Sequence, residues 1–246
     1  MTIEQSTEIN FTLNPDKEVT LVTAPGVFTP NATTNLLIQA VKSTISKPAN
    51  LLDLGCGTGI VGLALHFQDL ISSPLYASDL SASAVHCSRE NFERYACQAD
   101  VRGGSLFEPW KDKKFDVIVD DISGIAQGVA DVSPWFQEVP CDTGEDGTDL
   151  VLDIIRKAPQ HLNEGGHFFF PVLSLSNVDM ILQVANENFA TVVRVGRQDW
   201  PLPADLKEHM PLLQELYAAG AIKLEEKFGM VLCYTEVYCA TNPLFI

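Results

Sequence analysis

The chain has 246 residues, of which 46% are hydrophobic and 20% are charged, so it is long and apolar enough to bury a sizeable core. Its 16 Lys and Arg residues stand against 32 Asp and Glu residues, which gives a formal net charge of −16. Nucleic-acid binding normally needs a basic face. The charge therefore argues against DNA or RNA as a partner and favours a small-molecule or protein substrate.

The cysteines and the apolar runs indicate the compartment. The six cysteines form no CxxC pair and no His/Cys cluster with zinc spacing, so we expect reduced thiols and no metal site. We also expect no signal peptide and no membrane span, because no basic region precedes an apolar N-terminal run and no stretch of about 18 apolar residues occurs. These patterns predict a cytoplasmic protein.

The N-terminal part of the chain shows strand and helix signals in turn. Residues 1–24 hold two short alternating runs split by a turn that begins at Asn14, which predicts an N-terminal β-hairpin extension. After a loop, Thr33 or Thr34 is expected to cap a helix that runs to about Ser46.

Beyond the hairpin, residues 25–246 read as one cofactor-binding domain in which strand patterns alternate with helix patterns. The expected strands are 51–54, 74–78, 101–103, 115–119, 167–171, 191–195 and 230–237, and the expected helices are 60–67, 82–95, 150–161 and 177–187. Such alternation is typical of a doubly wound, seven-stranded, mainly parallel, Rossmann-like α/β sheet. Residues 197–229 interrupt the last strand pair and predict a helical insertion that forms part of a lid over the substrate.

A glycine-rich turn follows the first strand of the predicted sheet. Residues 51–59 read LLDLGCGTG and lead into a helix. Glycines let the backbone turn tightly and let a ligand approach without Cβ clashes, while the helix N-terminus offers free N–H groups. Open α/β sheets bind ligands at this carboxyl edge. We therefore expect a cofactor here; the alternative is a turn that only packs the helix on the strand.

A glycine run and two aspartates bear on which cofactor the turn binds. The run from Gly57 to Gly62 also matches the dinucleotide fingerprint G-x-G-x-x-G, and Asp79 could hold the ribose of either cofactor. Asp53 distinguishes between a dinucleotide and SAM as the cofactor. A carboxylate there repels a pyrophosphate but favours, directly or through water, the cationic ammonium and sulfonium groups of S-adenosylmethionine (SAM). The pattern favours SAM over NAD.

Asp53-Leu-Gly-Cys-Gly-Thr-Gly59 resembles the first motif of class I SAM-dependent methyltransferases. Three further segments resemble, in family order, the release-factor glutamine methyltransferases and related small methyltransferases: Phe28–Thr34, Gly104–Pro109 and Gly144–Asp149. The resemblance covers residues 25–172. It implies methyl transfer from SAM on a class I fold.

The resemblance also implies cofactor contacts at the turn. Gly55 and Gly57 would line the methionine portion of SAM, and Thr34 would sit near its carboxylate end. Asp79 would accept hydrogen bonds from both ribose hydroxyls. As an alternative, Thr34 would only cap a helix.

For the adenine of SAM, the resemblance implies three neighbouring side chains. Leu80 would pack on the ring, and Ser105 and Leu106 would flank it, with Ser105 in place of the family's usual acid. The alternative for Leu80 is an ordinary core position.

The match breaks after the fourth strand. Relatives that methylate planar nitrogens carry Asn-Pro-Pro-Tyr there, whereas this chain has Asp120 and then Asp121-Ile-Ser-Gly124, with Asp121 at the Asn position. This departure argues against glutamine or nucleobase N-methylation, although Trp135, Phe136 or Trp200 could replace the missing ring. We expect Asp121 to lie at the cofactor and to be the catalytic residue that orients an amine or hydroxyl acceptor and takes its proton; otherwise it caps a loop.

The leading interpretation is methyl transfer from SAM to a small molecule or a protein side chain. One alternative is an NAD(P)-dependent oxidoreductase, which Asp53 and the lack of a recognisable Tyr/Lys or His catalytic set disfavour. The other is a non-catalytic SAM-binding protein, which the altered segment Asp121–Gly124 leaves open.

Overall fold

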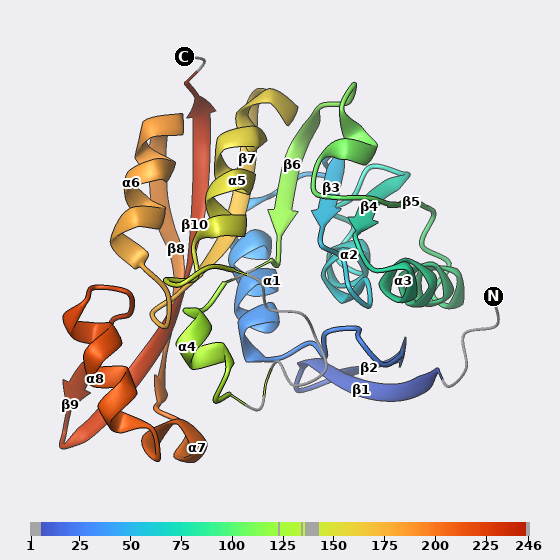
Figure 1. The fold of residues 1–246 in the computed structure, drawn as a ribbon. Helices are drawn as coiled ribbons and strands as arrows, with labels where there is room; N and C mark the ends of the chain where they lie inside the picture. Colours follow the sequence, from blue (N-terminus) through green and yellow to red (C-terminus); the bar gives the residue numbers. More distant parts are fainter. Residues whose placement is uncertain (1–5, 123, 134, 136–142, 245–246) are drawn as a thin grey trace. The chain divides into compact units, whose positions relative to one another are not determined.

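The computed structural model describes residues 6–122, 124–133, 135 and 143–244 (Figure 1). The chain divides into two compact units. The first comprises Met1–Asp121 and Gln160–Phe169, and the second comprises Ile122–Pro159 and Phe170–Ile246. Each unit is described by itself.

The first unit contains the hairpin and the parallel part of the sheet. Its elements are β1 (Thr7–Asn14), β2 (Lys17–Thr23), α1 (Ala32–Thr44), β3 (Leu51–Leu54), α2 (Ile60–His66), β4 (Leu75–Asp79), α3 (Ala82–Arg94), β5 (Ala99–Gly103), η1 (Glu108–Trp110), β6 (Phe115–Asp120), the end of η3 (Ala158–His161) and the first part of β7 (Leu162–Leu173). The strands pair in parallel in the order β5-β4-β3-β6-β7. All four residues of β3 are buried, as expected for a central parallel strand.

The N-terminal hairpin is confirmed, and it is fastened to α3. β1 and β2 pair antiparallel, and β2 lies beside α3 in Figure 1. The Tyr95 hydroxyl at the end of α3 donates to Thr20 O at 2.9 Å. The buried Asn91 amide accepts from Val22 N at 2.8 Å and donates to Val22 O at 2.9 Å. The hairpin is thus an integral part of the first unit.

The cap expected for α1 was wrong by two or three residues. Asn31 is the N-cap, and its side chain accepts from the backbone N–H groups of Thr33 and Thr34. Thr34 Oγ1 in turn accepts from Asn31 N at 3.4 Å, which completes a capping box. An Asn side chain reaches these N–H groups as well as a Thr side chain does, so composition alone could not choose between them.

The second unit contains the antiparallel part of the sheet and the insertion. Its elements are α4 (Gln127–Ala130), α5 (Asp149–Lys157), α6 (Val178–Asn188), β8 (Phe189–Pro201), α7 (Ala204–Lys207), α8 (Met210–Ala218), β9 (Glu225–Lys227), β10 (Met230–Pro243) and the last part of β7. β10 pairs antiparallel with β8 and with the short β9.

β7 belongs to both units. The hydrogen-bonded strands of the large sheet follow the order β5-β4-β3-β6-β7-β10-β8. This order confirms the predicted mainly parallel, Rossmann-like α/β fold with seven strands. β9 is an eighth strand of three residues beside β10, too short to be visible as a sequence pattern.

The helical insertion begins later than residue 197. β8 continues to Pro201, with Trp200 opposite Cys233 on β10. Arg197 holds this extension in place, because its guanidinium contacts the buried Glu236 of β10 at 2.9 Å. The helices of the insertion therefore occupy 204–218.

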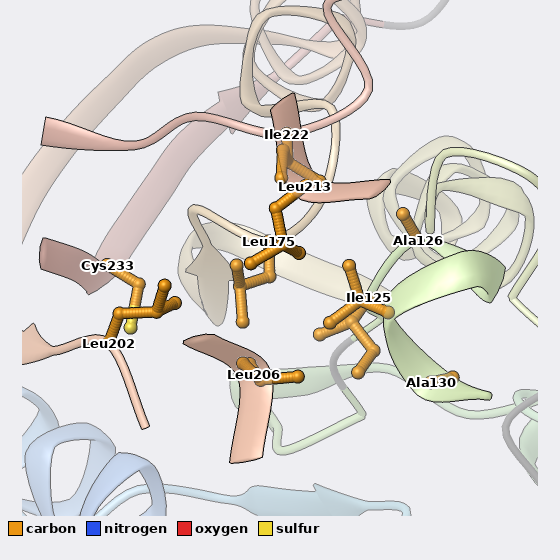
Figure 2. Packing of buried hydrophobic residues seen from close by; sticks show 10 residues of the cluster. Ile125, Ala126, Ala130, Leu175, Leu202, Leu206, Leu213, Ile222 and Cys233 are labelled. Carbon is orange, nitrogen blue, oxygen red and sulfur yellow. The ribbon is translucent and has the colours of Figure 1, made fainter. Parts of the chain in front are cut away.

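An apolar core within the second unit fixes the insertion in place; we call it the insertion core (Figure 2). Its buried members are Ile125, Ala126, Val129, Ala130, Leu175, Leu202, Leu206, Leu213, Ile222 and Cys233. Figure 2 shows the insertion side chains gathered around Ile125 and Leu175. At α4, a Cβ on Gly128 would lie 3.5 Å from the side chains of Leu212 and Leu216 on α8. The insertion is thus a packed part of its unit.

Membrane-spanning helices and metal-binding side-chain clusters are both absent from the described residues. None of the helices they form is long and apolar enough to cross a membrane. They contain no group of three His, Cys, Asp or Glu side chains that could hold a metal. Five of the six cysteines are described, and all five are free and buried: Cys56, Cys87, Cys97, Cys233 and Cys239. Cys141 lies outside the described residues.

Candidate functional site

The glycine turn between β3 and α2 is anchored on the end of β4. The backbone N–H groups of Gly55 and Cys56 both donate to Ser78 O, at 2.9 and 3.0 Å. Gly55, Gly57 and Gly59 have φ values of 69°, 52° and 79°. L-residues rarely adopt these angles, so the turn needs glycine at all three positions.

The glycines differ in what surrounds them. A Cβ on Gly59 would lie 2.7 Å from the Phe92 ring, so Gly59 allows close packing of α3 against the turn. A Cβ on Gly57 would meet nothing within 4 Å. Gly57 therefore keeps a space beside the backbone clear, and this is the position at which a ligand can approach the turn.

Asp53 lies beneath the turn and is fully buried. Its Oδ2 accepts from Gly62 N at 2.9 Å, which ties β3 to α2, while its Oδ1 has no hydrogen-bond partner among the described residues. Burial raises the pKa of Asp53 to about 7, and the nearby carboxylates of Asp121 and Asp79 add to the shift.

Asp79 holds the turn from the other side. Its Oδ2 accepts from Gly57 N at 2.9 Å, and its Oδ1 accepts from Ser81 N at 2.8 Å. The carboxylate is only partly buried, and each oxygen keeps a second lone pair. Asp79 can therefore accept hydrogen bonds from ligand hydroxyls while it orients the Gly57 amide.

Apolar side chains form the next part of the edge. Leu80 is 77% exposed, so its interpretation as a core residue was wrong. Leu106 has a φ of 47°, which is unusual for a residue with a side chain, and Ser105 is partly buried beside it. Behind Leu106, the Phe107 ring stacks on His161 with centroids 4.4 Å apart. An exposed leucine and a strained leucine after neighbouring strands β4 and β5 suit a flat apolar ring.

Thr34 and Asp121 join at the end of β6. Thr34 Oγ1 donates to Asp121 Oδ2 at 2.9 Å, and Thr34 is buried while Asp121 is partly buried. Burial raises the pKa of Asp121 to about 7, although the hydrogen bond from Thr34 opposes the shift. Thr34 thus belongs to the capping box of α1 and also donates a hydrogen bond to Asp121.

Comparison with known proteins finds a similarity to methyltransferases. Residues 18–121 match the family model "Methyltransferase small domain". A release factor glutamine methyltransferase of Geobacter sulfurreducens is 30% identical over 153 residues, which are 59% of this chain and 52% of the relative. Over residues 18–121, the chain matches the class I SAM-dependent methyltransferases.

A second relative is named for a different substrate. A ribosomal RNA small subunit methyltransferase C of Alcanivorax borkumensis is 31% identical over 151 residues, which are 59% of this chain and 40% of the relative. The chain thus spans about half the length of these curated relatives.

A solved structure supports the fold. A T. thermophilus 16S rRNA methyltransferase in complex with AdoMet and guanosine superposes with a TM-score of 0.61 at 16% identity, covering 97% of this chain and 50% of that one.

The first unit contains every residue that the sequence singled out for the cofactor. They are Thr34, Asp53, Gly55, Gly57, Asp79, Leu80, Ser105, Leu106 and Asp121. Two proposed replacements for the aromatic ring are described: Trp135 is 40% exposed, and Trp200 packs against the insertion core with its Nε1 donating to Thr235 at 3.3 Å. Phe136 lies outside the described residues.

Sequence reasoning missed Asn91. Besides holding β2, its Nδ2 donates to Thr58 O at 2.9 Å, so one buried amide links the hairpin, α3 and the glycine turn. The signal was a polar residue on the apolar face of α3, in line with Ala84 and Cys87 and next to Phe92. A buried amide must find partners, so its position indicates a structural link.

Proposed function

We propose that this chain binds SAM at the glycine turn and transfers the methyl group to an amine or hydroxyl of a protein side chain or small molecule. The observation that carries the proposal is the clear space at Gly57, whose amide is oriented by the Asp79 carboxylate. A dinucleotide would bring a diphosphate to this turn, where Asp53 and Asp79 would repel it. The same carboxylates favour a cation.

The residues present fit SAM. Gly55 and Gly57 would line its methionine part, Asp79 would accept the ribose hydroxyls, and Leu80 would cover the adenine. Ser105 and Leu106 would flank the adenine on its other side, and Thr34 would act near the methionine end through Asp121. When bound, SAM supplies a methyl group on a cationic sulfur.

Asp121 is the proposed catalytic residue. A carboxylate whose pKa is about 7 can be ionised before the reaction and can take the proton that the acceptor nitrogen or oxygen loses. Bound SAM would supply the methyl group, with its bond to sulfur broken as the acceptor took the methyl, while Asp121 held the acceptor. Thr34 fixes one oxygen of Asp121, which limits the directions from which the carboxylate receives the acceptor.

The net charge of the chain favours one of the two acceptor classes that the names of its relatives suggest. Those names include a protein methyltransferase and an rRNA methyltransferase. A net charge of −16 disfavours a polyanion, so we propose a protein or small-molecule acceptor. We further propose that residues 25–246 form the methyltransferase domain, with 1–24 as its hairpin extension, and that the chain works in the cytoplasm.

The test is incorporation of labelled methyl from SAM into the protein, metabolite and RNA fractions of a cell extract. We expect label in protein or metabolites. Asp121→Asn should lower the rate at least about tenfold, because the amide cannot take the proton, and should leave SAM affinity within about twofold. Thr34→Val keeps the carboxylate and should have a smaller effect. Label in RNA alone would contradict the acceptor class, and SAM binding without transfer would favour the non-catalytic alternative.

SAM affinity should rise with pH between 6 and 8. Both Asp53 and Asp121 have a pKa of about 7, so they are mostly neutral at pH 6 and mostly charged at pH 8, when they attract a sulfonium. We expect about fivefold tighter binding at pH 8, equivalent to about 1 kcal/mol. S-adenosylhomocysteine (SAH), which lacks the sulfonium charge, should change less.

Titration calorimetry across this pH range measures both affinities. Asp53→Asn serves as the control, since it removes one titrating group and should flatten the pH dependence for SAM. In the protein without ligand, the same raised pKa values make the free energy of unfolding fall, rather than rise, as pH increases. The folded state keeps protons that the unfolded chain releases, so their contribution to stability falls as pH rises from about 4 to 7. Equal pH dependence for SAM and SAH would contradict the electrostatic role of these acids.

A further inference from the structure

The N-terminal hairpin has two edges, and side chains of α3 occupy the edge of β2. Tyr95 Oη accepts from Thr20 N at 3.1 Å and donates to Thr20 O at 2.9 Å. The Asn91 amide bonds the N–H and C=O groups of Val22 in the same way. The backbone groups of Thr20 and Val22 therefore point toward α3 and away from β1. Because these groups already have partners, the β2 edge is closed to a further strand.

The edge of β1 is open. In an antiparallel pair, two residues that lie opposite each other point their backbone groups either toward one another or away from one another. Thr20 and Val22 lie opposite Asn10 and Glu8. The N–H and C=O groups of Glu8 and Asn10, and of Thr12 two residues further on, therefore point away from β2. In the part of the chain that the structure describes, no other backbone group bonds to them.

The β1 edge lacks the features that usually prevent strands from pairing. Exposed edges commonly carry proline or lysine, or are interrupted by a bulge. Residues Thr7–Thr12 contain neither proline nor lysine, and their only charged side chain, Glu8, is paired with Arg94 of α3 at 2.7 Å. The ladder to β2 is regular over these residues, since the register shift comes only between Thr12 and Asn14. β1 thus offers a regular and nearly neutral edge.

The order of side chains along β1 favours a second copy of the same strand as the partner. The order is symmetric about Asn10, with apolar Ile9 and Phe11 next to it and polar Glu8 and Thr12 beyond them. An antiparallel copy centred on Asn10 would place Glu8 opposite Thr12 and Ile9 opposite Phe11. No like charges would face each other, and an aromatic residue opposite a β-branched one stabilises a sheet.

We propose that this protein forms a two-fold symmetric dimer through the β1 edge, in which the two hairpins make one four-stranded antiparallel sheet. Asn10 lies on the two-fold axis and faces Asn10 of the second copy. Since the backbone groups of Glu8, Asn10 and Thr12 point outward, this register pairs all of them between the copies. The same surface serves both copies, as a two-fold contact requires. Two strands alone make a marginal sheet, so each hairpin gains from the added strands.

Sedimentation velocity of the full chain over a wide range of concentrations is the first test. We expect a concentration-dependent dimer. Asn10→Lys places two lysines opposite each other on the axis and should weaken dimerisation at least about fivefold. Thr20→Lys is the matched control, because it adds the same charge to the same face of the hairpin and removes the same hydrogen bond, from Thr20 Oγ1 to Asn10 Oδ1 at 2.9 Å. It lies one strand away from the open edge and should leave dimerisation nearly unchanged.

Cysteine cross-linking with oxidised glutathione is the second test. Directly opposite residues of a hydrogen-bonded antiparallel pair have Cα atoms about 5.5 Å apart, which a disulfide can span. Asn10→Cys should therefore give a covalent dimer. The two copies of Thr20 would be separated by three strand spacings, about 14 Å, so Thr20→Cys should give none. The native cysteines that the structure describes are buried and should add little background.

A chain that sediments as a monomer at every concentration would overturn the proposal. A dimer that Asn10→Lys and Thr20→Lys affect equally, or equal cross-linking of the two cysteine variants, would also overturn it, because the contact would then lie on another surface. Neither experiment uses SAM, so its failure is distinct from failure of the proposed function.

Discussion

Gly57→Ala should weaken SAM binding by about 5- to 150-fold while the protein stays folded. The added Cβ meets no protein atom within 4 Å, so it enters only the space that the ligand would use. Overpacking of this kind costs about 1–3 kcal/mol, which sets the range of affinity loss. Titration calorimetry with SAM measures the loss directly.

The matched control is Gly165→Ala in the same unit. Gly165 has a φ of 73° and, like Gly57, open space where its Cβ would be. Both variants carry the strain of a left-handed alanine, about 1–2 kcal/mol, but only Gly57 lies at the proposed site. If both variants bind SAM as the wild type does, the cofactor does not approach this turn.

Leu206→Ala should lower the free energy of unfolding by about 2–5 kcal/mol, because it removes a fully buried side chain from the insertion core. The surrounding residues Leu202, Leu213 and Ile222 come from the same insertion and cannot all move in to fill the space. Urea unfolding measures the change.

Tyr217→Ala is the control for this prediction, since Tyr217 is 54% exposed on α8 and should change stability by less than about 0.5 kcal/mol. An equally small effect for Leu206→Ala would show that the insertion is loosely attached and would favour a mobile lid. The packing predicts that deletion of residues 200–225 would expose Ile125 and Leu175 and would unfold the second unit.

The parts of the fold that the sequence predicted are those that depend on local pattern. The glycine turn requires three left-handed residues in a short span, and only glycine adopts them cheaply, so the residues themselves indicate the geometry. β3 and β6 are apolar runs of the length of one strand and lie in the centre of the sheet. Asp79 ends β4 at the carboxyl edge of the sheet, where open α/β sheets bind ligands, and this position in the sequence was enough to select it.

The parts that sequence reasoning missed depend on contacts between distant residues. The sequence did not indicate that Gly62, nine residues further on, donates to the buried Asp53 carboxylate, because no local pattern shows that contact. Asn91 acts through Val22 and Thr58, which lie far from it in the sequence. The end of β8 likewise depends on Arg197 meeting Glu236, a pairing set by the register of β10.

The central claim is that the glycine turn binds a sulfonium cofactor and rejects a dinucleotide. Isothermal titration of the wild-type protein with SAM, SAH and NAD tests it most directly. We predict measurable binding of SAM and SAH and none of NAD. Binding of NAD with no heat from SAM or SAH would contradict the account.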